Sequence, residues 1–125
     1  MKRILFLIFC PFLFLSCKGQ ETNTIKKITA QELDVALIEK VQLIDVRTPA
    51  EFREGHIENA TNIDVTGADF ETKIQALDKS KPVYVYCRSG HRSNIASKKM
   101  EEAGFKQIYD LKGGIKAWSG PTVVK

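Results

Sequence analysis

The chain has 125 residues, of which 43% are hydrophobic, and this length allows one domain of about 100 residues behind a separate N-terminal segment. The 19 basic residues fall by two when Lys2 and Arg3 are set aside with that segment, and the remaining 17 face 15 acidic ones. So small an excess does not imply nucleic-acid binding, and no nucleic-acid partner is predicted.

Residues 1–16 have the pattern of an export signal, because two basic residues precede an apolar run from Ile4 to Leu15. This run is too short to span a bilayer, which takes about 20 residues. The signal is followed by Cys17, and Phe14-Leu15-Ser16-Cys17 resembles the lipobox of bacterial lipoproteins, with Ser16 fitting the pattern and Phe14 and Leu15 departing from it. The resemblance implies cleavage before Cys17, a lipid anchor on Cys17, and a location in the cell envelope, with Lys18 favouring the outer membrane, facing the periplasm. The alternative is a plain cleaved signal that leaves a soluble protein.

The first half of the mature chain alternates between helices and strands. Residues 17–27 are polar and are predicted to be a tether that joins the anchor to a domain over 28–125. Capping-box spacing at residues 29–32 predicts a helix over 30–39. The apolar run over 41–46 predicts a strand of the kind that is buried on both faces.

The middle of the chain continues this alternation. Pro49 suits the first turn of a short helix that is predicted over 50–54. A turn follows, in which Asn59 is expected to adopt a left-handed conformation, and then a strand over 61–65. Apolar residues at i, i+4 and i+7 predict a helix over 68–77.

The last third holds the strand that matters most for function. An apolar run over 83–86 predicts a strand in the centre of the sheet. A helix with one apolar face then ends at Gly104, and a final strand is predicted over 106–111. A tight Gly113-Gly114 turn and one helical turn over 115–118 complete the domain.

This order of elements predicts an α/β fold with a parallel sheet, because strands alternate with helices of about ten residues. In such sheets, ligands bind at the carboxyl ends of the strands. Cys87 lies at one of these ends, and the turns that carry Arg47 and Asp110 belong to two others. These residues are therefore expected near one edge of the sheet.

The loop after the central strand carries the candidate nucleophile. The candidate site residues in the loop are Cys87, Arg88, Ser89, Gly90, His91, Arg92 and Ser93. Loop amides and the start of a helix favour an anion, and the two arginines add positive charge, so the pKa of Cys87 is predicted to be lowered. We expect an exposed, nucleophilic thiol here, although free cysteines are more often buried structural residues.

Several ordered motifs resemble those of single-domain rhodaneses. They are Leu43–Phe52 (LIDVRTPAEF), Gly55-His56-Ile57, Val85–Ser93 (VYCRSGHRS), Gly104-Phe105, and Leu111–Gly114 with Trp118. The resemblance implies a three-layer α/β fold, with a central parallel sheet of about four to five strands flanked by helices on both faces. Asn59 stands before an alanine where the family commonly has glycine, and asparagine tolerates the same backbone conformation.

The resemblance also implies a sulfurtransferase that needs no cofactor. Cys87 would take sulfur from thiosulfate as a persulfide and pass it to cyanide, a thiol or a protein acceptor. Amides of residues 88–93 would stabilise the persulfide anion, and Arg88 and Arg92 would hold the dianionic donor. His91 either tunes the thiol or is simply an exposed side chain.

Three further residues are expected to support the site structurally. Asp45 and Arg47 recur in rhodaneses as an ion pair at a strand end, and a partly buried pair explains them without catalysis. His56 is expected to bond to the backbone within its own turn. Of the three cysteines, Cys10 lies in the predicted signal and Cys17 would carry the lipid. The two histidines and the one remaining thiol lack metal-ligand spacing, so no metal site is predicted.

Two other functions remain open. One is a rhodanese module that carries a persulfide, or docks on another envelope protein, without useful turnover. The other is a phosphatase or arsenate reductase, which loop length disfavours. The related phosphatases place five residues between cysteine and arginine to enclose a phosphate, whereas only four separate Cys87 from Arg92.

Overall fold

A computed structural model describes residues 23–124 of the chain. The predicted export signal over 1–16, the candidate lipidation site Cys17 and residues 18–22 of the predicted tether lie outside these residues. Within residues 23–124, no helix combines the length and the apolar character that crossing a membrane requires.

Five parallel strands form the central sheet, in the spatial order β1-β6-β5-β2-β4, and two short strands, β3 and β7, pair antiparallel beside it. The elements in chain order are β1 (Ile25–Ile28), α1 (Ala30–Ala36), β2 (Gln42–Asp45), α2 (Pro49–Glu54), β3 (His56–Ile57), β4 (Thr61–Asn62), α3 (Phe70–Lys73), the 3₁₀ helix η1 (Ile74–Ala76), β5 (Val83–Tyr86), α4 (His91–Glu102), β6 (Ile108–Leu111), the 3₁₀ helix η2 (Gly114–Ala117) and β7 (Thr122–Val123). The predicted α/β fold class is confirmed.

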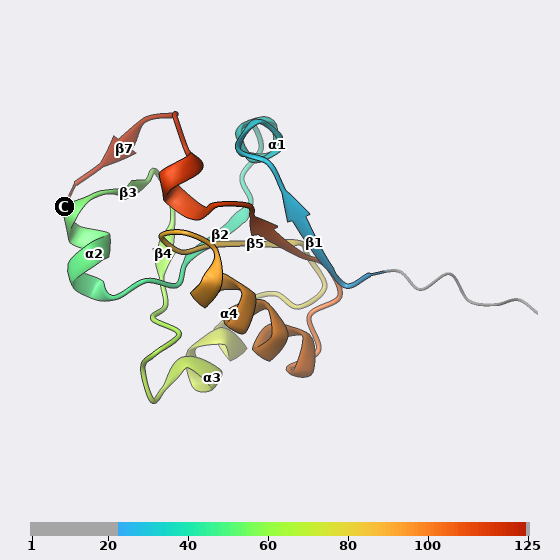
Figure 1. Cartoon of the computed structure of the whole chain (residues 1–125). Coiled ribbons are helices and arrows are strands. Elements are labelled where there is room, and N and C mark those ends of the chain that lie inside the picture. The colour runs from blue at the N-terminus through green and yellow to red at the C-terminus, as the bar shows by residue number, and fades with distance from the viewer. Residues whose placement is uncertain (1–22, 125) are drawn as a thin grey trace, which may run out of the picture.

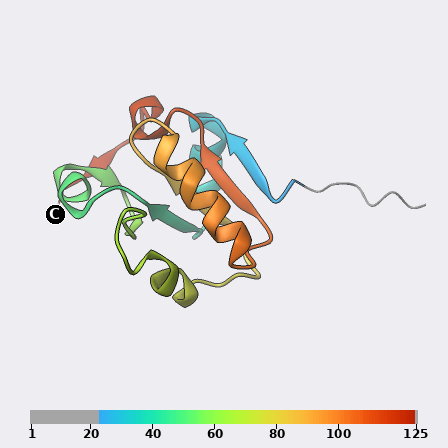
Figure 2. The same ribbon diagram turned by 60° about the horizontal axis from the view of Figure 1, so that its bottom comes forward.

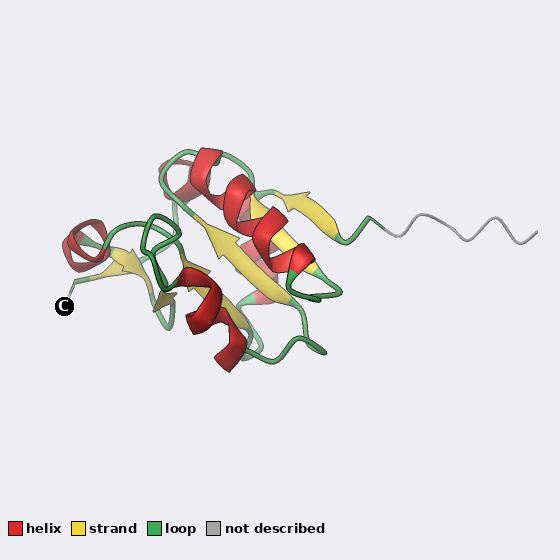
Figure 3. Cartoon of the chain, turned by 90° about the horizontal axis from the view of Figure 1, so that it is seen from below, coloured by secondary structure: helices red, strands yellow, loops and turns green. Residues whose placement is uncertain are grey.

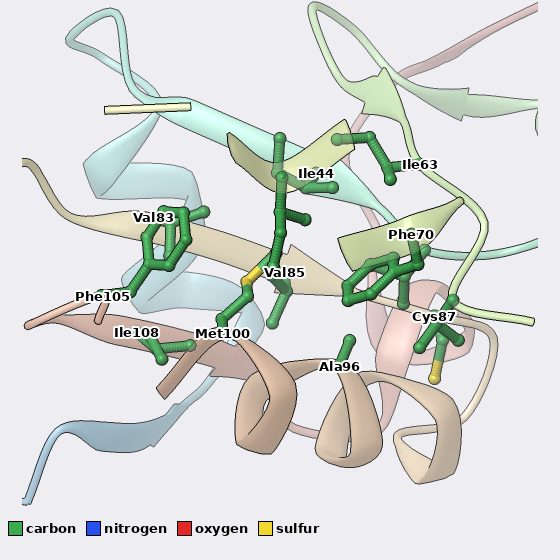
Figure 4. Packing of buried hydrophobic residues seen from close by; sticks show 13 residues of the cluster. Ile44, Ile63, Phe70, Val83, Val85, Cys87, Ala96, Met100, Phe105 and Ile108 are labelled. Carbon is green, nitrogen blue, oxygen red and sulfur yellow. The ribbon is translucent and has the colours of Figure 1, made fainter. Parts of the chain in front are cut away.

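Helices cover both faces of the sheet (Figure 1), with α1 on one side and α3 and α4 on the other. Figure 3, seen from below, shows α3 and α4 on the same face, in front of the strands of the sheet. Figure 4 shows the core on this face, where Val85 of β5 meets Phe70 of α3 and Met100 of α4. β5 lies between β2 and β6, so the prediction of a strand in the centre of the sheet is confirmed.

The predicted tether is wrong for its last three residues, because Ile25–Ile28 forms the edge strand β1 beside β6. Its two lysines, Lys26 and Lys27, are exposed and give the segment its polar composition. Ile25 and Ile28 are the residues that pack on the hydrophobic clusters. Charged side chains of this kind are common on edge strands, where they discourage pairing with other chains.

The predicted helices are present, and two of them are shorter than expected. α1 ends at Ala36, and i→i+3 hydrogen bonds continue the turn through Glu39. The helix predicted over 68–77 is α3 followed by η1, whose tighter turn still buries Phe70 and Ile74 completely. The apolar spacing therefore identified the buried face correctly but not the type of helix.

The strand predictions miss the small second sheet. Residues His56–Ile57 were predicted to be part of a turn, but they form β3 and pair with β7. β7 itself was not predicted, because the strand over 106–111 was expected to be the last one. Two-residue strands carry no periodic pattern, so their pairing depends on tertiary contacts. The left-handed conformation predicted for Asn59 is confirmed by its φ of 67°.

The hydroxyl of Ser97 in α4 gives a prediction about stability. Ser97 is fully buried, and its Oγ has no hydrogen-bond partner among the described residues. An unpaired buried hydroxyl costs about 1–3 kcal/mol, so Ser97→Ala is expected to raise the free energy of unfolding by about 1 kcal/mol. Urea denaturation measures this as a higher midpoint at an unchanged slope. The matched change at the exposed Ser119 is expected to have no effect, and a lower midpoint for Ser97→Ala would contradict the assignment.

Candidate active site

Cys87 directly follows β5 at the carboxyl edge of the sheet, where the sequence predicts a ligand site. Its sulfur points away from the middle of the core and toward the loop ahead of α4 (Figure 4). The residue is 1% exposed, so the expectation of an exposed thiol is wrong. The physical reason is that the loop folds back over the sulfur, while the Cys87 side chain also packs in the cluster beneath α3 and α4.

The backbone of the loop donates a hydrogen bond to the Cys87 sulfur. The amide nitrogen of Gly90 lies 3.0 Å from the Cys87 Sγ. The backbone of Gly90 is left-handed, with φ of 110°, and this conformation favours glycine. Burial opposes ionisation of the thiol, but hydrogen bonds from Ser93 and from the amides of Gly90 and Ser89 outweigh it, and the pKa of Cys87 is lowered. The sulfur is therefore held in surroundings that favour a thiolate.

The turn after β6 supports the loop from the other side. Figure 2 shows this turn and η2 beside the loop, and two hydrogen bonds join them: Ile115 N–H donates to the Cys87 carbonyl at 2.9 Å, and Lys116 N–H donates to the Arg88 carbonyl at 3.1 Å. Gly114 lies so close that a Cβ atom there would stand 2.4 Å from the carbonyl carbon of Arg88. Gly114 of the predicted turn thus allows the two backbone segments to touch.

A buried polar chain lies next to the sulfur. The Oγ of Ser93, in the first turn of α4, lies 3.5 Å from the Cys87 Sγ and donates a hydrogen bond of 2.6 Å to Oδ1 of Asp110. Asp110 is at the carboxyl end of β6, near the sheet edge where it was predicted to lie, and it is 1% exposed. The side chain of Ser93 thus contacts the Cys87 sulfur.

Arg92 is paired with an acidic residue. Its Nη1 and Nη2 lie 2.6 and 2.9 Å from the two carboxylate oxygens of Glu51, which belongs to the first turn of α2. The hydrogen bond from Arg92 is the main cause that holds the pKa of Glu51 at about 2. The positive charge of Arg92, which was predicted to hold the donor, is therefore balanced in large part by Glu51.

The remaining loop residues face outward. The side chains of Arg88, Ser89 and His91 are exposed, whereas Cys87 and Ser93 are buried. Of the candidates in the loop, the structure thus brings Gly90 and Ser93 to the sulfur and places these three on its outer side. A molecule that approaches the loop from solvent meets Arg88, Ser89 and His91 first.

Asp45 and Arg47 form a buried ion pair at the end of β2. Nη2 of Arg47 lies 2.6 Å from Oδ2 of Asp45 and 2.7 Å from the Gly55 carbonyl, so the pair ties β2 to the end of α2. Nδ1 of His56 lies 2.8 Å from the Phe52 carbonyl and donates to it. All these contacts are structural ones that fix the segment carrying Glu51.

Two residues near the loop were not among the sequence-based candidates: Glu51 and Gly114. Glu51 completes a capping box with Thr48, at the same spacing as Thr29 and Glu32 in α1, and this spacing was a usable signal. Asp110 was expected at this edge of the sheet, but its hydrogen bond with the loop was not predicted. The contact of Gly114 with the loop had no local signal.

A groove of about 690 Å³ lies elsewhere on the protein. Leu37, Ile38, Val41 and Trp118 are among the residues that line it, and none of residues 87–93 does. The Cys87 sulfur is therefore not at the base of this groove. The candidate site is identified by the chemistry of the loop around Cys87 and not by a cavity.

Comparisons with known proteins identify the family of this chain. The family model for the rhodanese-like domain matches residues 29–121. The chain is 36% identical over 122 residues to "Uncharacterized protein YqhL" of Bacillus subtilis, covering 98% of this chain and 94% of that one. It is 36% identical over 78 residues to "Thiosulfate sulfurtransferase GlpE" of Coxiella burnetii, covering 62% of this chain and 71% of that one.

Solved structures lead to the same family. The crystal structure of a rhodanese-like domain protein from Staphylococcus aureus is 30% identical and superposes with a TM-score of 0.72, over 80% of this chain and 98% of that one. The NMR structure of the rhodanese-like domain of Alr3790 from Anabaena is 28% identical with the same TM-score, over 79% of each chain. With its five-stranded parallel sheet and its cysteine loop, this chain belongs to the family of rhodanese-like domains.

Proposed function

We propose that this protein is a sulfurtransferase that carries a sulfur atom as a persulfide on Cys87. The observation that carries the proposal is the hydrogen bond of 3.0 Å from the Gly90 amide to the Cys87 sulfur, in a loop that lowers the pKa of that thiol. The named activity of its relative from Coxiella burnetii supports thiosulfate as the donor.

The reaction runs in two displacements at sulfur. The Cys87 thiolate attacks the outer sulfur of thiosulfate, the sulfur–sulfur bond of thiosulfate breaks, and its electron pair leaves with sulfite. Cys87 then carries a persulfide, whose charge the amides of the loop stabilise. Cyanide or an acceptor thiolate attacks the outer sulfur, and Cys87 leaves as a thiolate, ready for the next donor.

The surroundings of the sulfur support a small donor. Because Cys87 is 1% exposed, a donor whose reactive sulfur is terminal and unhindered is favoured over a bulky one. Arg88 is exposed within the loop that covers the sulfur, so its charge attracts such an anion from solvent, and Arg92 contributes the part of its charge that Glu51 does not balance. We therefore assign the first contact with the donor to Arg88.

Intact-mass spectrometry of the protein after incubation with thiosulfate tests this function. We expect a mass gain of one sulfur atom, confined to Cys87, that disappears when cyanide or a thiol is added, with formation of thiocyanate in the first case. Protein alkylated at Cys87 beforehand is the control and is expected to gain no sulfur. A sulfur that loads but cannot be discharged to any acceptor would instead favour a carrier or docking module, and failure to load would refute the proposal.

We also propose that the protein is exported and is anchored to the cell envelope by a lipid on Cys17, facing the periplasm from the outer membrane. This proposal is supported by the sequence of residues 1–18 alone, which lie outside the described residues. The same mass spectrum, recorded on protein isolated from membranes, tests it through the mass of the N-terminal residue. An N-terminus without lipid would refute the anchor.

A further inference from the structure

We propose that Asp110 is a positioning residue for the Cys87 thiolate, and that it takes up the proton of the thiol through the hydroxyl of Ser93. The inference rests on the proposed role of Cys87 as a nucleophile and concerns how that nucleophile is generated. It would give the buried thiol a route to ionise without releasing its proton to water.

The three groups form a continuous chain inside the protein. The Cys87 Sγ lies 3.5 Å from the Ser93 Oγ, and this Oγ lies 2.6 Å from Oδ1 of Asp110. None of the three residues is more than 1% exposed. Each comes from a different element, because Cys87 follows β5, Ser93 is in α4 and Asp110 is in β6. The pairing of Val85 with Asp110 places the carboxylate on the strand next to the thiol.

A hydroxyl group has a single hydrogen, and this limits what Ser93 can do. Two acceptors are available besides the sulfur: Asp110 at 2.6 Å and the Gly90 carbonyl at 3.2 Å, of which Asp110 is the nearer. While the thiol keeps its proton, S–H donates to the Ser93 oxygen and the Ser93 hydrogen is donated to Asp110. An ionised sulfur needs that same hydrogen for itself.

The conflict is resolved by moving two protons in one direction. The S–H bond of Cys87 breaks as the sulfur proton bonds to the Ser93 oxygen, and the original O–H bond of Ser93 breaks as its proton bonds to Asp110. The products are a thiolate that accepts a hydrogen bond from Ser93, and a neutral carboxyl that donates one to Ser93. Nothing is oxidised or reduced, and the net charge of the buried group is unchanged.

The electrostatics of Asp110 suit a proton acceptor. Burial raises the pKa of Asp110, and this effect exceeds the opposing effects of the hydrogen bond from Ser93 and the charge of Lys27. Three groups from neighbouring elements surround Asp110. Lys27 of β1 is its partner residue in the strand pairing, Cys87 follows the end of β5, and the uncharged Ser93 belongs to α4. The thiol and the carboxyl are thus the two acidic groups that share this chain.

The pH dependence of Cys87 alkylation by iodoacetamide tests the proposal without any sulfur donor. Because a shared proton makes the two ionisations interdependent, we expect the alkylation rate of the wild-type protein to rise in two steps with pH. Asp110→Asn is expected to give a single step, and Ser93→Ala a single step that lies at higher pH. Asp34→Asn, the same change at an exposed position, is the control and is expected to keep two steps.

A second measurement uses the protein without changing Asp110 or Ser93. Infrared spectra are expected to show the band of a protonated carboxyl group that persists toward neutral pH in the wild type and is lost when Cys87 is replaced by serine. A single alkylation step in the wild type, at the same pH as in Asp110→Asn, would overturn the proposal, as would absence of this band. Neither readout requires sulfur transfer, so the relay and the proposed function can fail separately.

Discussion

Replacement of Cys87 by serine is expected to abolish sulfur transfer. A hydroxyl is a far weaker acid than a thiol, and the loop amides cannot turn it into an anion that forms a sulfur–sulfur bond with the donor. The rate of thiocyanate formation from thiosulfate and cyanide should fall by on the order of 10³-fold or more, to the level of buffer. The mass of the variant should not change after thiosulfate.

The fold of this variant should be nearly unchanged, which makes the experiment informative. Serine is slightly smaller than cysteine, and its Oγ can accept the hydrogen bond that Gly90 donates to the sulfur. We expect a free energy of unfolding within about 1 kcal/mol of the wild type. If Cys87→Ser formed thiocyanate at the wild-type rate, Cys87 would not take part in the reaction. If this variant lost its stability, Cys87→Ala would be used in its place to test the same role.

Replacement of Gly114 by alanine is expected to damage both stability and activity. Its Cβ would stand 2.4 Å from the carbonyl carbon and oxygen of Arg88 and 2.6 Å from the carbonyl oxygen of Cys87, and none of these backbone atoms can move aside alone. The φ of +64° adds strain for any residue with a side chain. The loop must shift, and the free energy of unfolding should fall by on the order of 3 kcal/mol.

The effect on chemistry should be separable from the effect on folding. A loop displaced by about 1 Å is expected to slow sulfur loading on the order of 10²-fold at temperatures where the variant is still folded. Thermal unfolding and the rate of mass gain after thiosulfate measure the two effects. Gly55→Ala is the matched control, since a Cβ there would meet its nearest neighbour, Oγ1 of Thr122, at 3.9 Å. If Gly114→Ala behaved like this control, the loop would not depend on the close contact.

The sequence predicted the parts of this protein that depend on local pattern. The apolar run of β5, the glycine-containing loop and the helix after it are contiguous, so the position of Cys87 at a strand end could be inferred directly. β1 was missed because its buried residues, Ile25 and Ile28, are separated by two lysines whose exposure only the pairing with β6 reveals.

The contacts of the loop could not be read locally, because they join residues far apart in the chain. The pair between Glu51 and Arg92 depends on α2 lying beside the start of α4, and the contact of Ser93 with Asp110 depends on β6 pairing with β5. The burial of Cys87 has the same origin. A thiol that looks open in a loop is covered once this loop closes over it and packs beside η2.

The hydrogen bonds from Ile115 and Lys116 to the loop have a consequence for the order in which the protein becomes active. The cysteine is synthesised well before the segment that holds its loop in place. The hydrogen bonds that lower the pKa of Cys87 come from Ser89, Gly90 and Ser93 of that loop. We therefore expect the reactivity of this side chain to reach its final level only when the end of the domain docks, so that it reports the completion of folding.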